Sequence, residues 1–208
     1  MKKDRENTES RFWSRWAWLY DRFMRKDKAA YEKMYEHIRT AVRGKDVLEL
    51  ATGTGLIAKN IVHDARSVEA TDAAPEMIAE AKKKNTSSKL HFSIQDIFRL
   101  PYADGSFPVV IASNVLHIIP EPEKAIAEMK RVLSMDGVLI LPTFTHGDMG
   151  IFAKGKAKIM QGVGFPLHST WVPDTYKAFL EENGLEITYN TVLKASFPLT
   201  YVECKRGE

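Results

Sequence analysis

The stretch Val47-Leu48-Glu49-Leu50-Ala51-Thr52-Gly53-Thr54-Gly55-Leu56-Ile57-Ala58 decides the fold of this 208-residue chain. It combines an apolar strand, a turn of small residues and the start of a helix. Glycine suits such a turn because it lacks a Cβ, so the backbone can bend sharply and a ligand can approach it closely. The stretch therefore predicts a strand–turn–helix unit that binds a ligand at its turn.

Short β-rich segments alternate with helical segments on both sides of this unit. The predicted strands are 46–50, 67–71, 90–94, 109–113 and 138–141, and the predicted helices are 56–62, 75–84 and 123–134, the last ended by Asp136-Gly137. Such repetition is typical of a parallel sheet with right-handed crossovers. We therefore expect an α/β, doubly wound, Rossmann-like fold with helices on both faces of the sheet.

The C-terminal part of the chain has a different pattern. It predicts a helix over 173–183 with Gly184 at its C-terminal cap, followed by two strand-like segments at 186–193 and 197–205. These segments are close enough in sequence to pair as an antiparallel hairpin. Together with the five earlier strands they predict a mostly parallel seven-stranded sheet. Between the two parts, 143–170 is rich in glycine and includes a possible short helix at 153–161.

The composition is that of an ordinary soluble globular protein, with 44% hydrophobic and 27% charged residues. It excludes global disorder and collagen-like or coiled-coil arrays. The single cysteine, Cys204, excludes a disulfide framework and a multi-cysteine metal site, so we expect no metal. No apolar run reaches the ~18 residues of a membrane-spanning helix, and the charged start lacks a secretory core. A cytoplasmic location is therefore expected.

Positive charge is concentrated at the start of the chain. Residues 1–45 carry a net charge of +6, and the remainder carries −3. Residues 11–43 are predicted to be helical, with aromatic residues at helical spacing between arginines. We expect an N-terminal helical lid over 1–43 and the main domain over 44–208. The alternative is a basic amphipathic helix that makes peripheral contact with an anionic membrane.

Three acidic residues follow the predicted strands at their ligand-binding ends. Asp72 lies 17 residues beyond Gly55, where a carboxylate can accept both hydroxyls of a ribose. Asp96 closes the next strand and can contact an adenine edge. Glu49 precedes the glycine turn, where it would repel the pyrophosphate of a nicotinamide cofactor and attract a cationic group. The acids thus favour a cationic nucleoside over a dinucleotide.

At this point the sequence resembles the class I S-adenosylmethionine-dependent methyltransferases. The motifs that carry the resemblance are Leu48 to Gly55, Thr71-Asp72-Ala73-Ala74-Pro75-Glu76-Met77, Gln95 to Pro101, Asp104 to Phe107, Ser113 to His117 and Met129 to Leu133. They occur in the family's order and at its spacing. Ala51 stands where the family usually has its first glycine, and Pro108 replaces a common acid.

The resemblance implies S-adenosylmethionine as cofactor and S-adenosylhomocysteine as product. The turn from Glu49 through Ala51 and Gly53 to Gly55 would hold the methionine portion, and Asp72 the ribose. The Ala73 to Met77 motif would border the same site. Asp96 and Ile97 would hold the adenine, and Asn114 would lie beside the methyl group.

Methyl transfer from a sulfonium mainly requires alignment in a dry pocket, and a base is needed only if the acceptor must lose a proton. His117 and His146 follow the fourth and fifth predicted strands and are the candidate bases. Tyr20 belongs to a Tyr-Asp pair that resembles the signature of small-molecule and lipid members of the family. There the tyrosine closes over the cofactor.

Several hypotheses about function remain open at this point. The first is methyl transfer to a small molecule, and Trp16 to Asp21 also resembles bacterial phospholipid N-methyltransferases. A nicotinamide oxidoreductase and a non-catalytic cofactor-binding protein are the alternatives from other classes. A nucleic-acid acceptor is disfavoured because the basic residues form no stripe. The sequence specifies neither the acceptor atom nor the oligomeric state.

Overall fold

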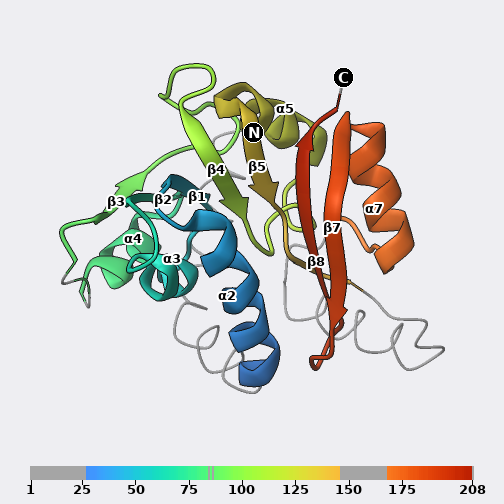
Figure 1. Cartoon of the computed structure of the whole chain (residues 1–208), viewed down its shortest axis with the longest axis horizontal. Coiled ribbons are helices and arrows are strands. Elements are labelled where there is room, and N and C mark those ends of the chain that lie inside the picture. The colour runs from blue at the N-terminus through green and yellow to red at the C-terminus, as the bar shows by residue number, and fades with distance from the viewer. Residues whose placement is uncertain (1–26, 84, 86, 146–167, 208) are drawn as a thin grey trace, which may run out of the picture.

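The computed structural model describes residues 27–83, 85, 87–145 and 168–207. In chain order the elements are α2 (Lys28–Val42), β1 (Asp46–Leu50), α3 (Leu56–Ile61), β2 (Ser67–Asp72), α4 (Pro75–Lys82), β3 (Leu90–Ile94), β4 (Phe107–Ala112), α5 (Pro122–Val132), β5 (Leu133–Ile140), β6 (Thr143–Phe144), α7 (Pro173–Glu182), β7 (Leu185–Leu193) and β8 (Leu199–Arg206). Figure 1 shows one central sheet with helices around it.

The sheet has the order β3-β2-β1-β4-β5-β8-β6, and β7 pairs with β8. Strands β1 to β5 are parallel, and β6, β7 and β8 add antiparallel pairings. The doubly wound architecture and the C-terminal hairpin predicted from the sequence are confirmed. The predicted number of seven strands is wrong, because two residues after β5 form the additional strand β6 against β8.

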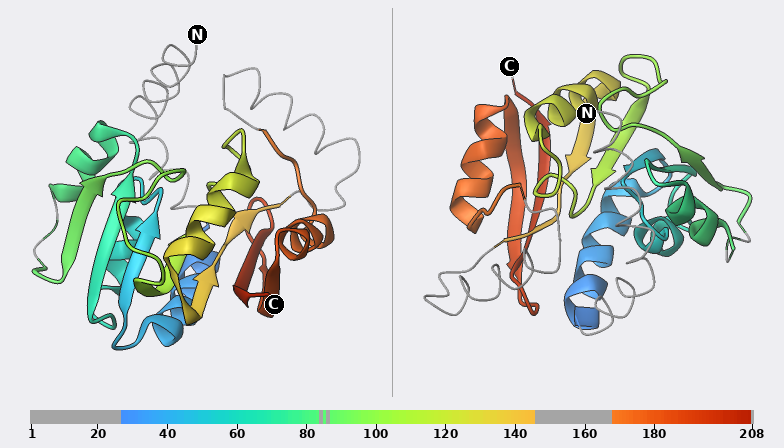
Figure 2. Two further views of the ribbon diagram at one scale, coloured as in Figure 1. Left: turned by 90° about the horizontal axis from the view of Figure 1, so that it is seen from above. Right: turned by 180° about the vertical axis from the view of Figure 1, so that it is seen from behind.

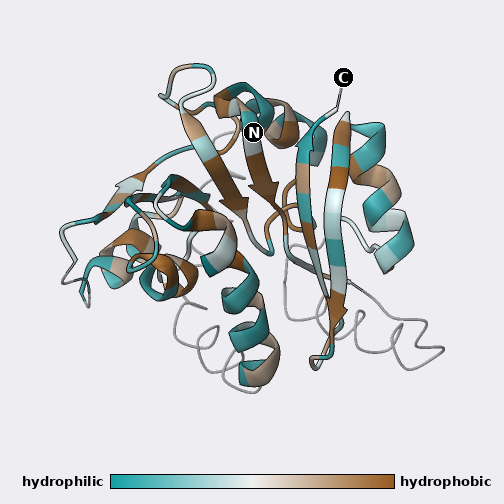
Figure 3. Ribbon diagram, viewed as in Figure 1, coloured by the Kyte–Doolittle hydropathy of each residue, from teal (hydrophilic) through white to brown (hydrophobic). Residues whose placement is uncertain are grey.

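Two hydrophobic clusters fill the space on opposite faces of the sheet. The first joins α2, α3 and α4 to alternate residues of the strands, and the second joins α5 and α7 to the remaining ones. Figure 2 shows these helices flanking the sheet. The central strands are strongly hydrophobic in Figure 3, since strands covered on both faces bury nearly all their side chains. Successive side chains of β1 point to opposite faces of the sheet, so every second residue of this strand faces α2 and α3.

The boundary between α5 and β5 differs from the prediction. The helix ends at Val132, and the strand begins at Leu133 rather than at Val138. Leu133 pairs with Phe107, and the register then shifts so that Val109 faces Val138. Pairing with β4 thus extends β5 N-terminally past Gly137. Gly137 lies within the strand, so the prediction that it ends the helix is wrong.

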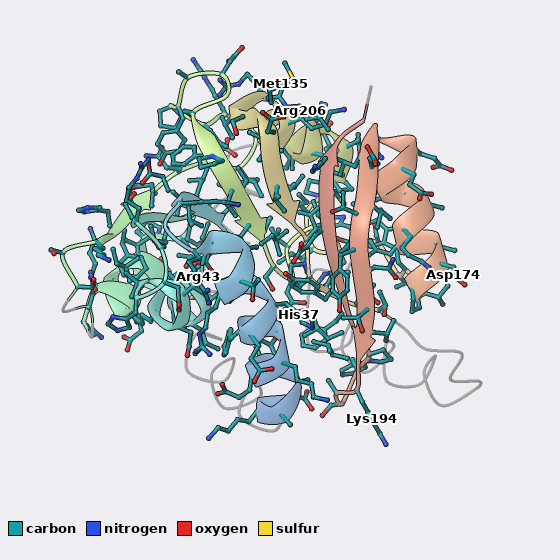
Figure 4. The ribbon with its side chains drawn as sticks, in the orientation of Figure 1. His37, Arg43, Met135, Asp174, Lys194 and Arg206 are labelled. Atoms are coloured by element: carbon teal, nitrogen blue, oxygen red, sulfur yellow. The ribbon has the colours of Figure 1, made fainter. Side chains whose placement is uncertain are left out.

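Helix α2 connects the N-terminal part of the described chain to the C-terminal hairpin. His37 stacks on Tyr201 of β8, with their ring centroids 5.1 Å apart, and lies 5.2 Å from the Tyr189 ring of β7 (Figure 4). At the start of α2, Asp27 accepts hydrogen bonds from the backbone N–H and hydroxyl of Ser196 in the β7–β8 turn. Both interactions hold α2 against the domain core.

Part of the predicted N-terminal lid lies within the described residues. Its segment 28–42 is helical, and its buried face belongs to the same cluster as α3 and the central strands. The rest of the predicted lid, and the possible short helix at 153–161, lie outside the described residues. The domain boundary at residues 43 and 44 stays a prediction. No described helix is both long and apolar enough to cross a membrane.

Candidate functional site: the cavity at the carboxyl ends of β1 and β4

The turn between β1 and α3 has the conformation that the glycines predicted. Ala51, Gly53 and Gly55 all have positive φ, at 51°, 57° and 77°. The turn is closed by a hydrogen bond from the Gly55 N–H to the Thr52 carbonyl, 2.9 Å long. Within the described part of the chain, a Cβ at Gly53 would meet no atom within 4 Å, whereas one at Gly55 would lie 2.7 Å from the Phe92 ring. Gly55 is thus required by packing, and Gly53 leaves open space.

Asp72 ties the end of β2 to this turn. Its Oδ2 accepts a 2.8 Å hydrogen bond from the Gly53 N–H, and its Oδ1 accepts a 2.9 Å bond from the Ala74 N–H. The parallel pairing of Leu50 with Thr71 brings the two segments together. Burial raises the pKa of Asp72, and the backbone N–H donors oppose this effect. The carboxylate is therefore oriented by the backbone at the ligand-binding edge.

Glu49 is a buried carboxylic acid on the face of β1 that looks toward α2 and α3. It is only 2% exposed, and its Oε2 has no hydrogen-bond partner among the described residues. Burial raises its pKa to about 8, because a carboxylate is poorly solvated there. A cation placed beside Glu49 would favour the ionised form and lower this pKa.

Glu49 opens onto a cavity between the glycine turn, α2 and the end of β4. The described residues that line it come from α2, β1 and α3 and from the loops that follow β1 and β4: Tyr31, Glu49, Ala51, Thr52, Leu56, Ile57, Ser113 and Asn114. Three of these, Glu49, Ala51 and Asn114, were predicted site residues. The fold therefore gathers the predicted acid and the predicted strand-end amide around one space.

Asn114 holds three segments together at the end of β4. Its backbone has a φ of 54°, and its N–H donates to the Pro142 carbonyl over 2.8 Å. Its Oδ1 accepts from the Phe144 N–H at 3.0 Å, and its Nδ2 donates to the Tyr31 hydroxyl at 3.1 Å. A non-glycine residue persists in this conformation only where its surroundings fix it, as they do here.

Tyr31 is one of the five lining residues that were not predicted, and the one that comes from outside the strand ends and the glycine turn with its helix. It lies on the buried face of α2 and is 3% exposed. Its only sequence signal is its spacing from Met34, Tyr35 and Ile38 on one helical face, which predicts packing and says nothing about a ligand. The tyrosine that the motif singled out, Tyr20, lies outside the described residues, as does the candidate base His146.

His117 is buried between β4 and β6. Its Nδ1 lies 2.9 Å from the Thr143 hydroxyl, and its carbonyl accepts hydrogen bonds from the backbone N–H groups of His168 and Ser169. It is 7% exposed and is not among the described residues that line the cavity. These contacts indicate that His117 fixes the chain segment after β4. Its role as a base stays a prediction.

Asp96 lies at the same edge of the sheet, beyond β3. It is exposed, and its Oδ1 accepts a 2.9 Å hydrogen bond from the Phe98 N–H within its own turn. The parallel pairing of Asp72 with Ile94 places the two acids on neighbouring strand ends. Ile97 is half-buried against the cluster on the α5 side. This arrangement leaves the Asp96 carboxylate accessible from solvent.

The remaining predicted residues lie around the start of α4. Ala73 is exposed in the segment between Asp72 and the helix, whereas Met77 is buried on the inner face of α4. Pro75 occupies the first turn of α4, where its missing N–H is not needed. Met77 therefore contributes to packing in this structure, and contact of either residue with a ligand stays a prediction.

Comparison with protein families identifies the segment that contains this site. Residues 48–141 match the model of a methyltransferase domain. The match includes Glu49, the glycine turn, Asp72, Asp96 and Asn114, and it contains all but one of the described residues that line the cavity. The outstanding one is Tyr31, which precedes the matched segment.

Individual relatives are also named as methyltransferases. The chain is 36% identical to a demethylmenaquinone methyltransferase of Renibacterium salmoninarum over 112 residues, which are 54% of this chain and 46% of that protein. It is 27% identical to a phosphatidylethanolamine N-methyltransferase of Cereibacter sphaeroides over 205 residues, which cover 95% of this chain and 97% of that protein. The chain thus spans about half the length of the first relative and nearly all of the second.

Solved structures of the same fold extend over the whole chain. The structure of DhpI in complex with SAH superposes with a TM-score of 0.75 and 22% identity, covering 97% of both chains. At this level of identity the likeness concerns the fold. It includes the C-terminal hairpin, which lies beyond the matched family segment.

Proposed function

We propose that the protein transfers a methyl group from S-adenosylmethionine to a small-molecule acceptor, since its residues 48–141 match the model of a methyltransferase domain. One observation carries the proposal: the buried Glu49, whose Oε2 has no partner among the described residues, faces a cavity that the glycine turn also lines, and the same turn donates to Asp72 through the Gly53 N–H. A cationic nucleoside satisfies both features, because its positive charge pairs with Glu49 and its ribose hydroxyls with Asp72.

The residues present fit this cofactor. Glu49 would hold its positively charged end, the open backbone at Gly53 would allow close approach, and Asp72 would accept from the ribose. A dinucleotide fits less well, because its pyrophosphate brings no positive charge to pair with Glu49 at the turn, and the ionised acid would repel it. The cofactor supplies a methyl group on a sulfonium that is already a good leaving group.

The contribution of the protein to such a reaction is orientation and exclusion of water. Asn114 and the turn between β1 and α3 are fixed by backbone hydrogen bonds, so groups bound between them lose little further freedom on reacting. The cavity walls contributed by Leu56 and Ile57 are apolar, which strengthens electrostatic interactions inside. A general base at His117 would be needed only for an acceptor that must lose a proton.

Calorimetry with S-adenosylmethionine, S-adenosylhomocysteine and NAD tests the proposal. We expect binding of the first two and none of NAD, and affinity for NAD alone would overturn the assignment. A turnover assay with methyl-labelled S-adenosylmethionine over amines, thiols, phenols and phospholipids then tests catalysis. Binding without turnover on any acceptor would favour the non-catalytic alternative.

A phospholipid acceptor is the second candidate. It is supported by the similarity to the phosphatidylethanolamine N-methyltransferase, which extends over 95% of this chain and includes its basic N-terminal segment. Vesicles of phosphatidylethanolamine with an anionic phospholipid provide the test at low salt. Label transferred to the vesicle lipid would support this acceptor, and a protein that stays in the supernatant with unlabelled lipid would exclude it.

A further inference from the structure

Tyr31 and Glu49 reach the same cavity from two different elements. Tyr31 comes from α2, and Glu49 comes from the face of β1 that looks toward α2 and α3. Both side chains are more than nine-tenths buried, yet both line the space. A carboxylate and an aromatic ring around one cavity are the two groups with which proteins recognise a desolvated cation.

The position of the Tyr31 ring is fixed on several sides. Its hydroxyl accepts the hydrogen bond from Asn114 Nδ2, and Asn114 is itself held by the Phe144 N–H and the Pro142 carbonyl. The ring also packs against Tyr35, with centroids 6.0 Å apart, and Phe144, at 6.5 Å. An aromatic side chain held this firmly is preorganised for a ligand.

The hydrogen bond with Asn114 also links Tyr31 to the ligand-binding edge of the sheet. Figure 1 shows the start of α2 at the end of the molecule toward which β4 and β5 point. Asn114 follows β4 at that edge, and it joins Tyr31 across 83 positions of sequence. Because a buried tyrosine hydroxyl needs a hydrogen-bond partner, this bond to Asn114 fixes the ring at the cavity.

We propose that Tyr31 is a specificity-determining residue whose ring, held by Asn114 at the cavity that Glu49 also lines, recognises the sulfonium charge of the bound nucleoside and so distinguishes the methylated cofactor from its product, which lacks that charge. The inference rests on the proposed function. Its consequence is that loss of the ring weakens binding of the cation more than binding of the uncharged thioether, because only the cation is attracted to the ring face.

The test compares dissociation constants for S-adenosylmethionine and S-adenosylhomocysteine, measured by calorimetry at one pH. In Tyr31→Leu we expect the affinity ratio to shift against S-adenosylmethionine by about fivefold or more. Tyr31→Phe keeps the ring and should keep the ratio within about twofold, even though both affinities fall with the lost Asn114 contact. Tyr201→Leu, which truncates a buried tyrosine of β8 that is not among the described residues lining the cavity, is the matched control and should leave the ratio unchanged.

Two results would overturn the inference. One is an equal loss of affinity for both ligands in Tyr31→Leu, and the other is an equal shift of the ratio in Tyr201→Leu. If Tyr31→Leu does not fold, Tyr31→Met is measured against the same criteria. A wild-type protein that binds neither ligand would instead contradict the proposed function, so the two failures are distinguishable.

Discussion

The backbone N–H of Gly53 donates a 2.8 Å hydrogen bond to Oδ2 of Asp72, which joins the turn after β1 to the end of β2. Ala74 N–H occupies the other carboxylate oxygen. The aspartate is therefore oriented before any ligand arrives, with lone pairs of both oxygens still able to accept further hydrogen bonds. This preorganisation makes the affinity for a nucleoside sensitive to changes at position 72.

Replacing Asp72 by alanine should lower the affinity for S-adenosylmethionine by about 1.5–3 kcal/mol, the scale of a charge-assisted hydrogen-bonded contact. Asp72→Asn should lose less, since it keeps one acceptor oxygen. Calorimetry provides the measurement. Asp104→Ala is the control, because this exposed acid pairs with Arg131 away from the cavity. Unchanged affinity in Asp72→Ala would mean that the ribose binds elsewhere.

Glu49 should make the ligand-free protein less stable as the pH rises. Its pKa is about 8 in the folded protein and about 4.3 in an unfolded chain, so the folded state holds the extra proton between these values. The free energy of unfolding therefore falls through this window, by up to about 1.4 kcal/mol per pH unit from this group. Glu49→Gln removes this titratable group and therefore removes its contribution to the pH dependence of stability.

Denaturant unfolding of wild type and Glu49→Gln at pH 5 and pH 7.5 measures this effect. We expect the variant to gain stability relative to wild type as the pH rises, and parallel curves would contradict the placement of the acid. Binding of a cation should also release a proton from Glu49 near pH 7. Calorimetry in two buffers with different ionisation enthalpies detects that proton, and Glu49→Gln should release less.

Gly55→Ala should destabilise the protein by about 2–4 kcal/mol. The added Cβ would lie 2.7 Å from the Phe92 ring, and alanine is strained at a φ of 77°. Gly53→Ala is the matched control, because its φ is also positive but its Cβ would meet no atom within 4 Å. Denaturant unfolding should show the smaller loss, about 1 kcal/mol, for Gly53→Ala.

Adding Phe92→Leu should recover part of the loss caused by Gly55→Ala, because the smaller side chain removes the ring that the Cβ meets. A double-mutant cycle with the same unfolding measurement gives the coupling. Strictly additive effects would show that the ring is not the obstacle. The remaining cost in the double variant reports the backbone strain.

Ala51→Gly should stabilise the ligand-free protein by about 1 kcal/mol. Ala51 has a φ of 51°, a conformation that glycine adopts without steric cost. Ala79→Gly, at an exposed position of α4, is the control and should destabilise by about 0.5–1 kcal/mol. A loss of stability in Ala51→Gly, measured by thermal unfolding, would show that the turn adopts another conformation in solution.

The helix and strand pattern followed from the sequence wherever the determining signals were local. The strands Asp46–Leu50 and Leu90–Ile94 have the predicted bounds, since apolar alternation and the bordering turn residues define them. The predicted boundary between α5 and β5 was wrong, because pairing of Leu133 with Phe107 extends the strand beyond the residues that its local sequence pattern indicates. Likewise, β6 exists only through its pairing with β8.

The sequence by itself determined the glycine turn, the distance to Asp72 and the acid at position 49, because backbone strain and strand alternation act over a few residues. Only the tertiary structure decided that Tyr31 meets Asn114 and that both share a cavity with Glu49. That meeting depends on which face of α2 packs against the sheet. Such a choice is made by contacts between residues far apart in the chain, which no local pattern encodes.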